Sequence, residues 1–322
     1  MRSILITGAA GFLGYHLSKK WLDSGYHVIG VDNMITGQEK NISDLKAHGK
    51  DQFYFIKADI SKPWASWRDL IPTPILDQIS YVFHFASIAS PHLFLRYSLE
   101  IMEANSQGLQ YAVNFADNLN AKVIFASTSE IYGSLTSETF REDQWGFTNT
   151  YGERACYDES KRIGEAYIYS TNKKNGTQHG LVRIFNTYGP RMNPADERVI
   201  QHLMKQALAD QALTIHGDGQ QVRSFCYVDD LIDGIYQYAL KNITLPVNLG
   251  QFEGITIIDL AKTIKMVLNK EVPVVFTVGR SDDPKHRKPD LSRALNLLSP
   301  WRPKVFLQTG LIKMAEWVRN DL

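Results

Sequence analysis

This sequence has few cysteines, almost no net charge and no long hydrophobic run. Of 322 residues only Cys156 and Cys226 are cysteines, so we expect no disulfide framework and a reducing, cytoplasmic environment. The formal net charge of +1 gives no reason to expect nucleic acid or an anionic membrane as a partner. No stretch approaches the roughly 18 apolar residues of a membrane span, and the N-terminus does not resemble a signal peptide.

Short apolar runs alternate with helix-like segments through the first part of the chain. We predict buried strands at residues 3–6, 27–31, 53–57, 81–85, 122–126 and 181–185. We predict helices at residues 12–24, 38–48, 64–70, 98–118 and 156–174. Alternation of this kind favours an α/β fold in which helices cover both faces of a parallel sheet.

The pattern changes after Tyr188, where helices at 199–209 and 256–268 mix with short strands and links rich in glycine and proline. We interpret residues 188–322 as a smaller lobe that binds substrate over the carboxyl ends of the parallel strands. Residues 1–187 then form the cofactor-binding domain, and we expect the two parts to be interleaved.

A glycine-rich turn at residues 8–14 joins the first strand to the first helix. Gly8, Gly11 and Gly14 allow a tight turn and close approach to a pyrophosphate, which the helix N-terminus at Phe12 and Leu13 stabilises. At the end of the second strand stand Asp32 and Asn33. A carboxylate there accepts hydrogen bonds from ribose hydroxyls and repels a 2′-phosphate, so the prediction is a doubly wound Rossmann-type sheet that binds NAD, with no metal.

Two further loops at the same sheet edge are expected to contact the cofactor. One follows the third strand and lies near the adenine, and the other ends the fourth strand. The residues expected to make these contacts are Asp59, Ile60, Phe85, Ala86 and Ser87. His84, just before them, we interpret as a packed core residue.

Tyr157 and Lys161 are one helical turn apart, so both project from one face of the helix at 156–174. A free tyrosine has a pKa of about 10, and about 4 kcal/mol of preferential phenolate stabilisation would bring it near neutrality. A neighbouring ammonium and the positive nicotinamide ring can supply that stabilisation together. The pair is specific here because the glycine turn precedes it and residues 127–130 follow the fifth strand.

Together these features resemble the extended short-chain dehydrogenase/reductase family, whose members epimerise, dehydrate or decarboxylate nucleotide sugars. The likeness is nearest to the branch that decarboxylates UDP-glucuronate. It continues through residues 126–133, 154–162, 183–192, 217–230 and 282–285, and so covers essentially the whole chain.

The resemblance implies transient oxidation at the sugar C4, loss of the carboxylate from the resulting β-keto acid, and return of the hydride to give UDP-xylose. It implies that Tyr157 is the base and later the acid, that Lys161 tunes its pKa and binds ribose, and that Thr128 binds the 4-oxygen. Glu130 and Arg223 would act around C5 and C6. Residues expected to bind the nucleotide sugar are Ser129, Asn186, Arg191, Arg198, Arg223, Arg287 and Asp290. The resemblance also implies a homodimer formed through the helices at 98–118 and 156–174.

Some positions depart from the decarboxylase pattern. Ile88 replaces a proline, Glu103 a lysine, Tyr111 an asparagine and Glu197 a glycine. If the residue at 103 faces the sugar carboxylate, glutamate there disfavours an anionic sugar. A 4-epimerase or a C4 oxidase acting on a UDP- or dTDP-hexose therefore stays open.

A 4,6-dehydratase is a further alternative, but Ser129 lacks the acid that such enzymes carry at this position. A non-enzymatic NAD sensor is the remote alternative. Such sensors commonly lose the tyrosine or the lysine, and both Tyr157 and Lys161 are intact here.

Overall fold

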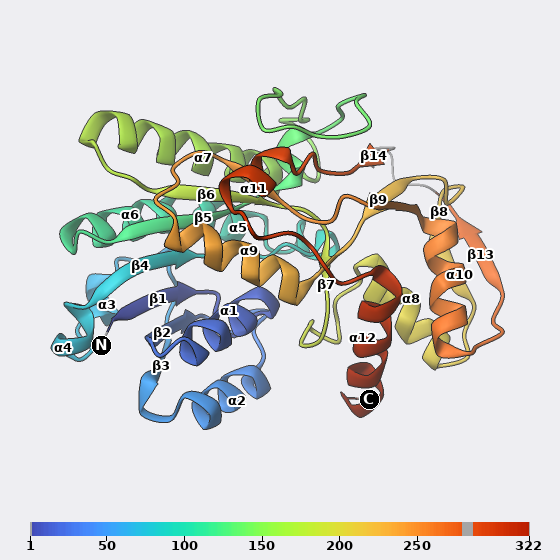
Figure 1. Cartoon of the computed structure of the whole chain (residues 1–322), viewed down its shortest axis with the longest axis horizontal. Coiled ribbons are helices and arrows are strands. Elements are labelled where there is room, and N and C mark those ends of the chain that lie inside the picture. Colours follow the sequence, from blue (N-terminus) through green and yellow to red (C-terminus); the bar gives the residue numbers. More distant parts are fainter. Residues whose placement is uncertain (1, 279–285, 322) are drawn as a thin grey trace.

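A seven-stranded parallel sheet forms the centre of the computed structural model, which describes residues 2–278 and 286–321. Its strand order is β11-β6-β5-β4-β1-β2-β3 (Figure 1). The strands are β1 (Ser3–Thr7), β2 (His27–Asp32), β3 (Phe53–Lys57), β4 (Ile79–His84), β5 (Lys122–Thr128), β6 (Gly180–Ile184) and β11 (Val247–Leu249). The six strands predicted from the sequence are all present, which confirms the doubly wound α/β fold.

Helices cover both faces of this sheet because successive side chains of its strands point to opposite faces and most of them are apolar. Ile4 and Ile6 of β1 pack on one side, and Leu5 packs on the other. The first side is covered by α1 (Phe12–Asp23), α2 (Glu39–Gly49) and α9 (Val228–Leu240). The second side is covered by α6 (Gln107–Asn118) and α7 (Ala155–Asn175).

The helix predicted at residues 98–118 is not continuous. It is divided at Ser106 into α5 (Ser98–Asn105) and α6, and the prediction was wrong on this point. The Ser106 hydroxyl donates to the Met102 carbonyl, a local bond that competes with regular helical geometry. The helix predicted at 64–70 is also shorter, with α3 (Ala65–Arg68) and then α4 (Thr73–Leu76).

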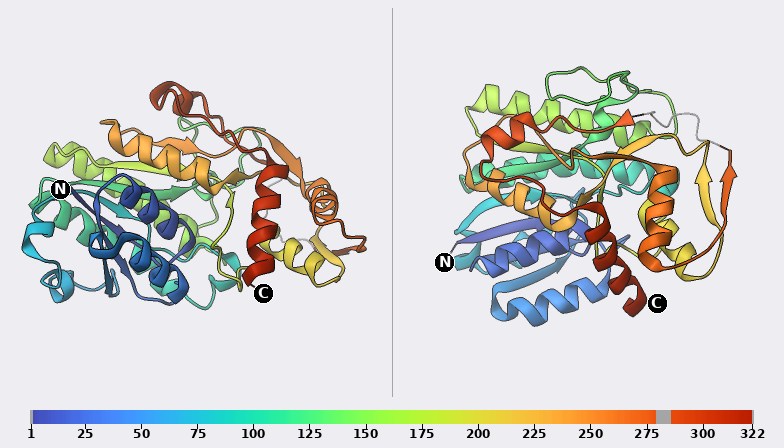
Figure 2. Two further views of the ribbon diagram at one scale, coloured as in Figure 1. Left: turned by 60° about the horizontal axis from the view of Figure 1, so that its bottom comes forward. Right: turned by 45° about the vertical axis from the view of Figure 1, so that its right-hand side comes forward.

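A second lobe lies beyond the carboxyl ends of the sheet strands, where Figure 1 shows α8, α10, β8 and β13 together on the right. Its helices are α8 (Val199–Leu208), α10 (Ile257–Leu268) and α12 (Leu307–Asp321), which Figure 2 shows from two further sides. Two parallel strands, β8 (Leu213–His216) and β13 (Val274–Thr277), form one of its sheets. In another, β9 (Val222–Ser224) lies between β12 (Gly254–Thr256) and β14 (His286–Arg287).

The chain passes between the two lobes more than once. β7 (Thr187–Tyr188) pairs with β10 (Cys226–Tyr227), and α9 then returns to pack along α1 (Figure 1). β11 joins the edge of the central sheet beside β6, and α11 (Ser292–Leu297) packs next to it. The division into residues 1–187 and 188–322 stays a prediction. In the part of the chain that the structure describes, no helix is long and apolar enough to cross a bilayer.

Candidate active site

The glycine turn between β1 and α1 has three glycines with three different tasks. Gly8 has φ +77°, and a Cβ there would lie 2.9 Å from the Ala86 backbone. A Cβ on Gly14 would lie 2.0 Å from the Gly8 carbonyl oxygen, so only glycine lets α1 begin this close to the turn. A Cβ on Gly11 would meet, among the described atoms, only that oxygen at 3.3 Å, and would otherwise enter open space.

The start of α1 suits an anionic group. Its first residues, Phe12 and Leu13, follow Gly11, and among the described residues no side chain caps this end and no acid lies in the first turn. The backbone N–H groups and the positive end of the helix dipole therefore point to the open space above Gly11. These residues fit the pyrophosphate of a dinucleotide.

Asp32 ends β2 next to this turn. Its carboxylate accepts hydrogen bonds from the backbone N–H of Ala10 at 3.0 Å and of Met34 at 2.8 Å. Burial raises the pKa of Asp32, although these two hydrogen bonds oppose the rise. The adjacent Asn33 side chain accepts from the N–H of Ile35 at 3.1 Å. The carboxylate is thus held by the loop in the place that the sequence assigns to the adenosine ribose.

The two predicted cofactor loops lie on either side of the glycine turn. After β3, Asp59 forms a local turn by accepting from the N–H and hydroxyl of Ser61, and Ile60 is buried. After β4, the N–H groups of Phe85 and Ala86 both donate to the Thr7 hydroxyl, at 3.0 and 3.1 Å. Their contacts with NAD stay predictions.

His84 and Asn105 are structural supports beneath this region. His84 is fully buried against Phe125, and burial lowers its pKa to about 3, so it is a packed neutral residue. Asn105 donates from Nδ2 to the hydroxyls of Ser87 and Ser160, both at 3.0 Å. It ties the loop after β4 to α7, and sequence reasoning missed it because a single asparagine in a helix carries no pattern.

Tyr157 and Lys161 lie on the buried face of α7. The Lys161 ammonium donates to the Ala126 carbonyl at 2.7 Å, and burial lowers its pKa to about 7. The Tyr157 ring stacks on Phe94 with centroids 5.0 Å apart. Burial raises the pKa of Tyr157 to about 12, although a hydrogen bond with Thr128 opposes the rise.

The protein without cofactor therefore does not lower the pKa of Tyr157 as the sequence analysis expects. Lys161 Nζ is 5.7 Å from the centre of the tyrosine ring, and its bond is to Ala126. Because the same burial depresses the pKa of Lys161 itself, its positive charge is only partly retained at neutral pH.

The end of β5 places Thr128, Ser129 and Glu130 beside Tyr157. Thr128 accepts a hydrogen bond from the Glu130 N–H at 3.2 Å and so caps the short helix η3 (Ser129–Tyr132). Ser129 is buried. Ile88, at the position where the family has proline, packs on the apolar cluster that holds Phe94 and Tyr157.

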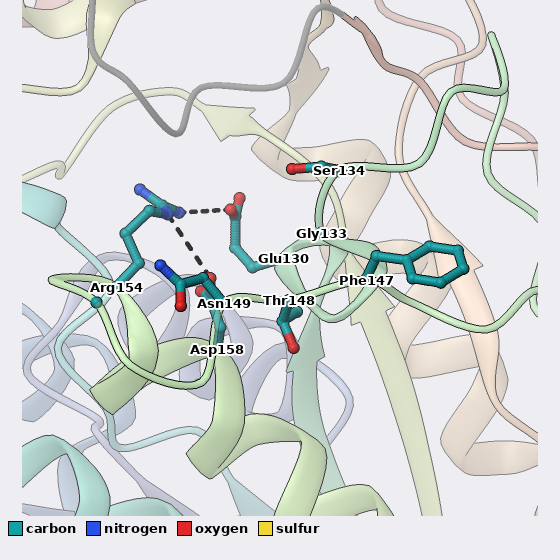
Figure 3. A pocket seen from close by; sticks show the side chains of 9 residues that line it. Glu130, Gly133, Ser134, Phe147, Thr148, Asn149, Arg154 and Asp158 are labelled. Carbon is teal, nitrogen blue, oxygen red and sulfur yellow. Dashed lines mark hydrogen bonds and ion pairs between the residues drawn. The ribbon is translucent and has the colours of Figure 1, made fainter.

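Glu130 lies between two arginines from opposite sides of the site. Arg154, at the start of α7, donates to Oε2 of Glu130, and Figure 3 shows its guanidinium pointing at that carboxylate. Arg287 of β14 bonds to Oε1 at 2.8 Å and to Oε2 at 3.0 Å. Arg287 is the register partner of Arg223 on β9, so the second lobe brings two arginines together here.

Asp158 completes this cluster, and like Arg154 it was missed in the sequence. Arg154 Nε is 3.7 Å from Oδ2 of Asp158, and both side chains line one small cavity with Glu130 (Figure 3). Burial first, and then the negative charge of Glu130, raise the pKa of Asp158 to about 7. For Arg154, the sequence did contain an indication of a site role. It precedes Tyr157 by about one helical turn and therefore shares its face.

The other predicted substrate residues are distributed unevenly. Arg198 pairs with Asp196 at 2.7 Å, and its charge acts to lower the pKa of Tyr157. Arg191 lies elsewhere, paired with Asp44 of α2 and stacked 4.8 Å from the Tyr15 ring centre. The structure therefore brings Arg198 toward Tyr157 and places Arg191 on the cofactor side.

Two of the predicted substrate residues have structural contacts. The Asn186 carbonyl accepts from the N–H of Cys226 at 2.8 Å, and its side chain is partly buried. Asp290 accepts from the N–H of Ser292 at 2.8 Å, at the start of α11. The motif at residues 282–285 lies outside the described residues, and the contacts of Asn186 and Asp290 with substrate stay predictions.

Glu103 does not face this site, which removes an expected obstacle to an anionic sugar. Its carboxylate lies 3.3 Å from the Ser61 hydroxyl and 3.4 Å from the Lys62 ammonium. Those residues follow Asp59 in the loop assigned to the adenine. The condition under which glutamate at 103 would oppose a sugar carboxylate is therefore not met, because this side chain is directed to the loop after β3.

Comparison with known proteins identifies the family to which the chain is similar. Residues 4–250 match the model of the NAD dependent epimerase/dehydratase family. UDP-glucuronic acid decarboxylase 1 of Danio rerio is 37% identical over 321 residues, which are 100% of this chain and 73% of that protein. UDP-glucuronic acid decarboxylase 3 of Arabidopsis thaliana is 37% identical over 99% of this chain and 90% of its own length.

Solved structures resemble the whole chain. The UDP-glucose 4-epimerase of Thermotoga maritima, solved with UDP-glucose, superposes with a TM-score of 0.89 at 27% identity and covers 99% of both chains. The UDP-glucuronic acid 4-epimerase of Bacillus cereus, solved with UDP-glucuronic acid and NAD, gives 0.87 at 28% identity, covering 99% of this chain and 100% of that one.

The fold and the site thus define a Rossmann-type enzyme that uses NAD as its cofactor. The chain belongs to the NAD-dependent epimerase/dehydratase family.

Proposed function

We propose that this enzyme decarboxylates UDP-glucuronate to UDP-xylose through transient oxidation at C4. The observation that carries the proposal is the group of charged side chains beside the reacting tyrosine. Arg154 and Arg287 each contact the carboxylate of Glu130, whose charge acts on Tyr157. Glu103 contacts Ser61 and Lys62 instead. Similarity to UDP-glucuronic acid decarboxylases over essentially the whole chain supports the same reaction.

Tyr157, Thr128 and Lys161 carry the oxidation step. NAD, when bound, takes up the hydride that leaves C4 and later returns it. Tyr157 removes the proton from the 4-hydroxyl in its phenolate form, which the positive ring of bound NAD would favour over the buried phenol, whose pKa is about 12. Thr128, which is hydrogen-bonded to Tyr157, binds the same oxygen. Lys161, with its pKa of about 7, is suited to exchanging a proton near neutral pH while Ala126 holds its position.

The ketone formed at C4 makes the sugar a β-keto acid. Its carboxylate leaves as carbon dioxide because the bonding electrons move into the C4 carbonyl. The enolate then takes a proton at C5. We assign Glu130 to passing on a proton that its carboxylate first accepts from solvent water, with Arg223 orienting the sugar. Arg223 is buried on β9 beside Arg287, a position from which an arginine fork can also bind diphosphate oxygens.

A UDP-glucuronate 4-epimerase is the second candidate. It is favoured by the likeness to the Bacillus cereus enzyme and needs the same oxidation by Tyr157. The two reactions differ only after the 4-ketone forms, when one loses carbon dioxide and the other keeps it. Dehydration is less favoured because Ser129 offers no acid for the leaving hydroxyl.

The test is to incubate the purified protein with UDP-glucuronate and NAD and to follow the products by mass spectrometry. Loss of carbon dioxide identifies decarboxylation, and a product of unchanged mass with inverted C4 identifies epimerisation. Turnover of neutral UDP- or dTDP-hexoses in place of UDP-glucuronate would exclude both acidic-sugar reactions. Tyr157→Phe is the control that removes the base.

We also infer a homodimer. Leu99 and Met102 of α5 and Ile163 and Tyr169 of α7 are apolar or aromatic side chains that are 69%, 44%, 54% and 65% exposed. Since α5 and α7 pack against each other, these side chains can bury one another across two copies. Light scattering tests this, and Ile163→Glu should give monomers while Met266→Glu in α10 should not. The cytoplasmic location stays a prediction, supported by two buried free cysteines.

A further inference from the structure

The carboxylate of Glu130 is already bound as a substrate carboxylate would be. Both of its oxygens accept hydrogen bonds from guanidinium groups, Oε1 from Arg287 and Oε2 from Arg287 and Arg154. Only 12% of its side chain is exposed. A planar guanidinium matches a carboxylate in geometry as well as charge, and such contacts are strong where water is largely excluded.

Arg154 is the more accessible of the two arginines. Its side chain is 24% exposed, against 11% for Arg287, and it lines a cavity of about 50 Å³ together with Glu130 and Asp158. A cavity that holds one water molecule has about 10–15 Å³ of such space, so this one has room for a group of a few atoms. Figure 3 shows the Arg154 guanidinium over Asp158 and beside Glu130, while Phe147 points away.

The charges of the cluster also suit an anion. Arg154 and Arg287 are cations, and Glu130 and Asp158 are their acidic partners. Asp158 is buried, and its Oδ1 lacks a hydrogen-bond partner among the described residues, which favours the protonated form. A protonated Asp158 leaves two guanidinium groups to one carboxylate, that of Glu130, within this group of four side chains.

The position is right for C6 of the sugar. Arg154 immediately precedes α7, about one turn before Tyr157, and Glu130 lies two residues after Thr128. When Tyr157 and Thr128 hold the 4-oxygen, the carboxylate is attached to the next ring carbon, so the side chains that flank Tyr157 are the ones placed to bind it.

We propose that Arg154 binds the carboxylate of the sugar, and that Glu130 occupies this guanidinium until the substrate displaces it. The proposal rests on the proposed function, because it requires an acidic sugar. Displacement releases Glu130 from one arginine at the moment when a sugar is present for it to act on. Arg154 is thus a residue that selects an acidic over a neutral sugar, and Glu130 is its internal competitor.

The test is calorimetric titration of the NAD-loaded protein in a Tyr157→Phe background, which prevents turnover. UDP-glucuronate and UDP-xylose are the two ligands, because they differ only in the carboxylate. We expect Arg154→Gln to weaken UDP-glucuronate binding about ten-fold or more and UDP-xylose binding less than about two-fold. Arg141→Gln, an exposed arginine paired with Asp143, is the matched control and should change neither.

Glu130→Gln gives the second measurement. Removing the competitor should strengthen UDP-glucuronate binding several-fold and leave UDP-xylose unchanged, and Arg154→Gln in the same chain should abolish that gain. Equal effects on both ligands, or a gain that persists without Arg154, would overturn the proposal. If Arg154→Gln does not fold, the Glu130→Gln variant decides alone. The proposal is overturned if that variant binds UDP-glucuronate no more tightly than the protein with Glu130.

Failure of the proposed function is distinguishable from failure of this inference. A wild-type enzyme that releases no carbon dioxide, with carboxylate-dependent binding through Arg154 intact, removes the decarboxylation and keeps the recognition. If the wild-type enzyme releases carbon dioxide but Arg154→Gln weakens the binding of UDP-glucuronate and UDP-xylose equally, the decarboxylation is kept and the recognition by Arg154 is removed.

Discussion

Lys161 directs its ammonium to the carbonyl oxygen of Ala126, 2.7 Å away, and not to the phenolic oxygen of Tyr157. The bond connects α7 to the end of β5, the strand that also supplies Thr128. Lys161 therefore fixes α7, the helix that carries Tyr157, and its titratable nitrogen lies 5.7 Å from the centre of that tyrosine ring.

Replacement of Lys161 by glutamine should lower kcat by about 100-fold or more, as for loss of a group that assists proton transfer. The KM for the nucleotide sugar should change little, because the side chain is buried and lies against Ala126 and Tyr157. Steady-state kinetics separates the two effects. An unchanged kcat would exclude Lys161 from the reaction, and thermal unfolding checks that the variant remains folded.

Alanine at Gly14 and at Gly11 should have different consequences. At Gly14 the new methyl group would lie 2.0 Å from the Gly8 oxygen, so α1 must shift and the melting temperature should fall by several degrees. At Gly11 the methyl group enters open space, so stability should be retained while NAD affinity falls. Gly25→Ala, where nothing lies within 4 Å, is the control and should cost about 1 kcal/mol of stability, with NAD affinity unchanged. Equal NAD affinity in wild type and Gly11→Ala would contradict the assignment.

Asp158 should make stability depend on pH. Burial and Glu130 raise its pKa to about 7, so the folded chain holds a proton that the unfolded chain releases near pH 4. The stabilisation from this proton is present below about pH 4 and is lost as pH rises through about 7. The charged groups that act on Asp158 are Glu130 of η3, Arg154 and Glu159 of α7 and Arg287 of β14.

Asp158→Asn should therefore be more stable relative to wild type at high pH than at low pH. The difference in melting temperature should grow by about 3 °C or more between about pH 5.5 and pH 8.5. Differential scanning calorimetry at the two pH values measures it. A difference that stays constant or shrinks would contradict a folded-state pKa near 7 for Asp158.

Glu103→Lys restores the residue that the decarboxylase pattern has at this position. Because Glu103 contacts Ser61 and Lys62 and not the Glu130 cluster, kcat/KM for UDP-glucuronate should change less than about two-fold. A ten-fold gain would mean that the side chain reaches the sugar after all. Lys62→Glu, which places a second acid beside Glu103, is the control for local charge effects and should also leave kcat/KM within about two-fold.

The sequence was sufficient for the sheet and the glycine turn, because both are set by local rules. Strands buried on two faces are continuously apolar, and Gly8 and Gly14 stand where only glycine fits. The break at Ser106 was not predictable from periodicity, since apolar residues continue at helical spacing on both sides of it. Nor was the return of β11 to the central sheet, which depends on contacts distant in the sequence.

The candidate site residues were likewise proposed from the sequence, and their roles stay predictions, but the charge pairs around them were not foreseen. Tyr157, Lys161 and Thr128 follow from motif and spacing, whereas the partners of Glu130 come from α7 and from β14 in the second lobe. The direction of the Glu103 side chain is a further example. A sequence gives the position of a residue along α5, and only the packed structure gives the loop that it faces.

The central claim is decarboxylation that begins with proton removal by Tyr157. Its most direct test is mass spectrometry of UDP-glucuronate incubated with NAD and either the wild-type enzyme or Tyr157→Phe. We predict a UDP-pentose and carbon dioxide from the wild type and unchanged UDP-glucuronate from the variant, which should still bind NAD. A wild-type product that keeps its carboxylate, or a variant as active as wild type, would contradict the account.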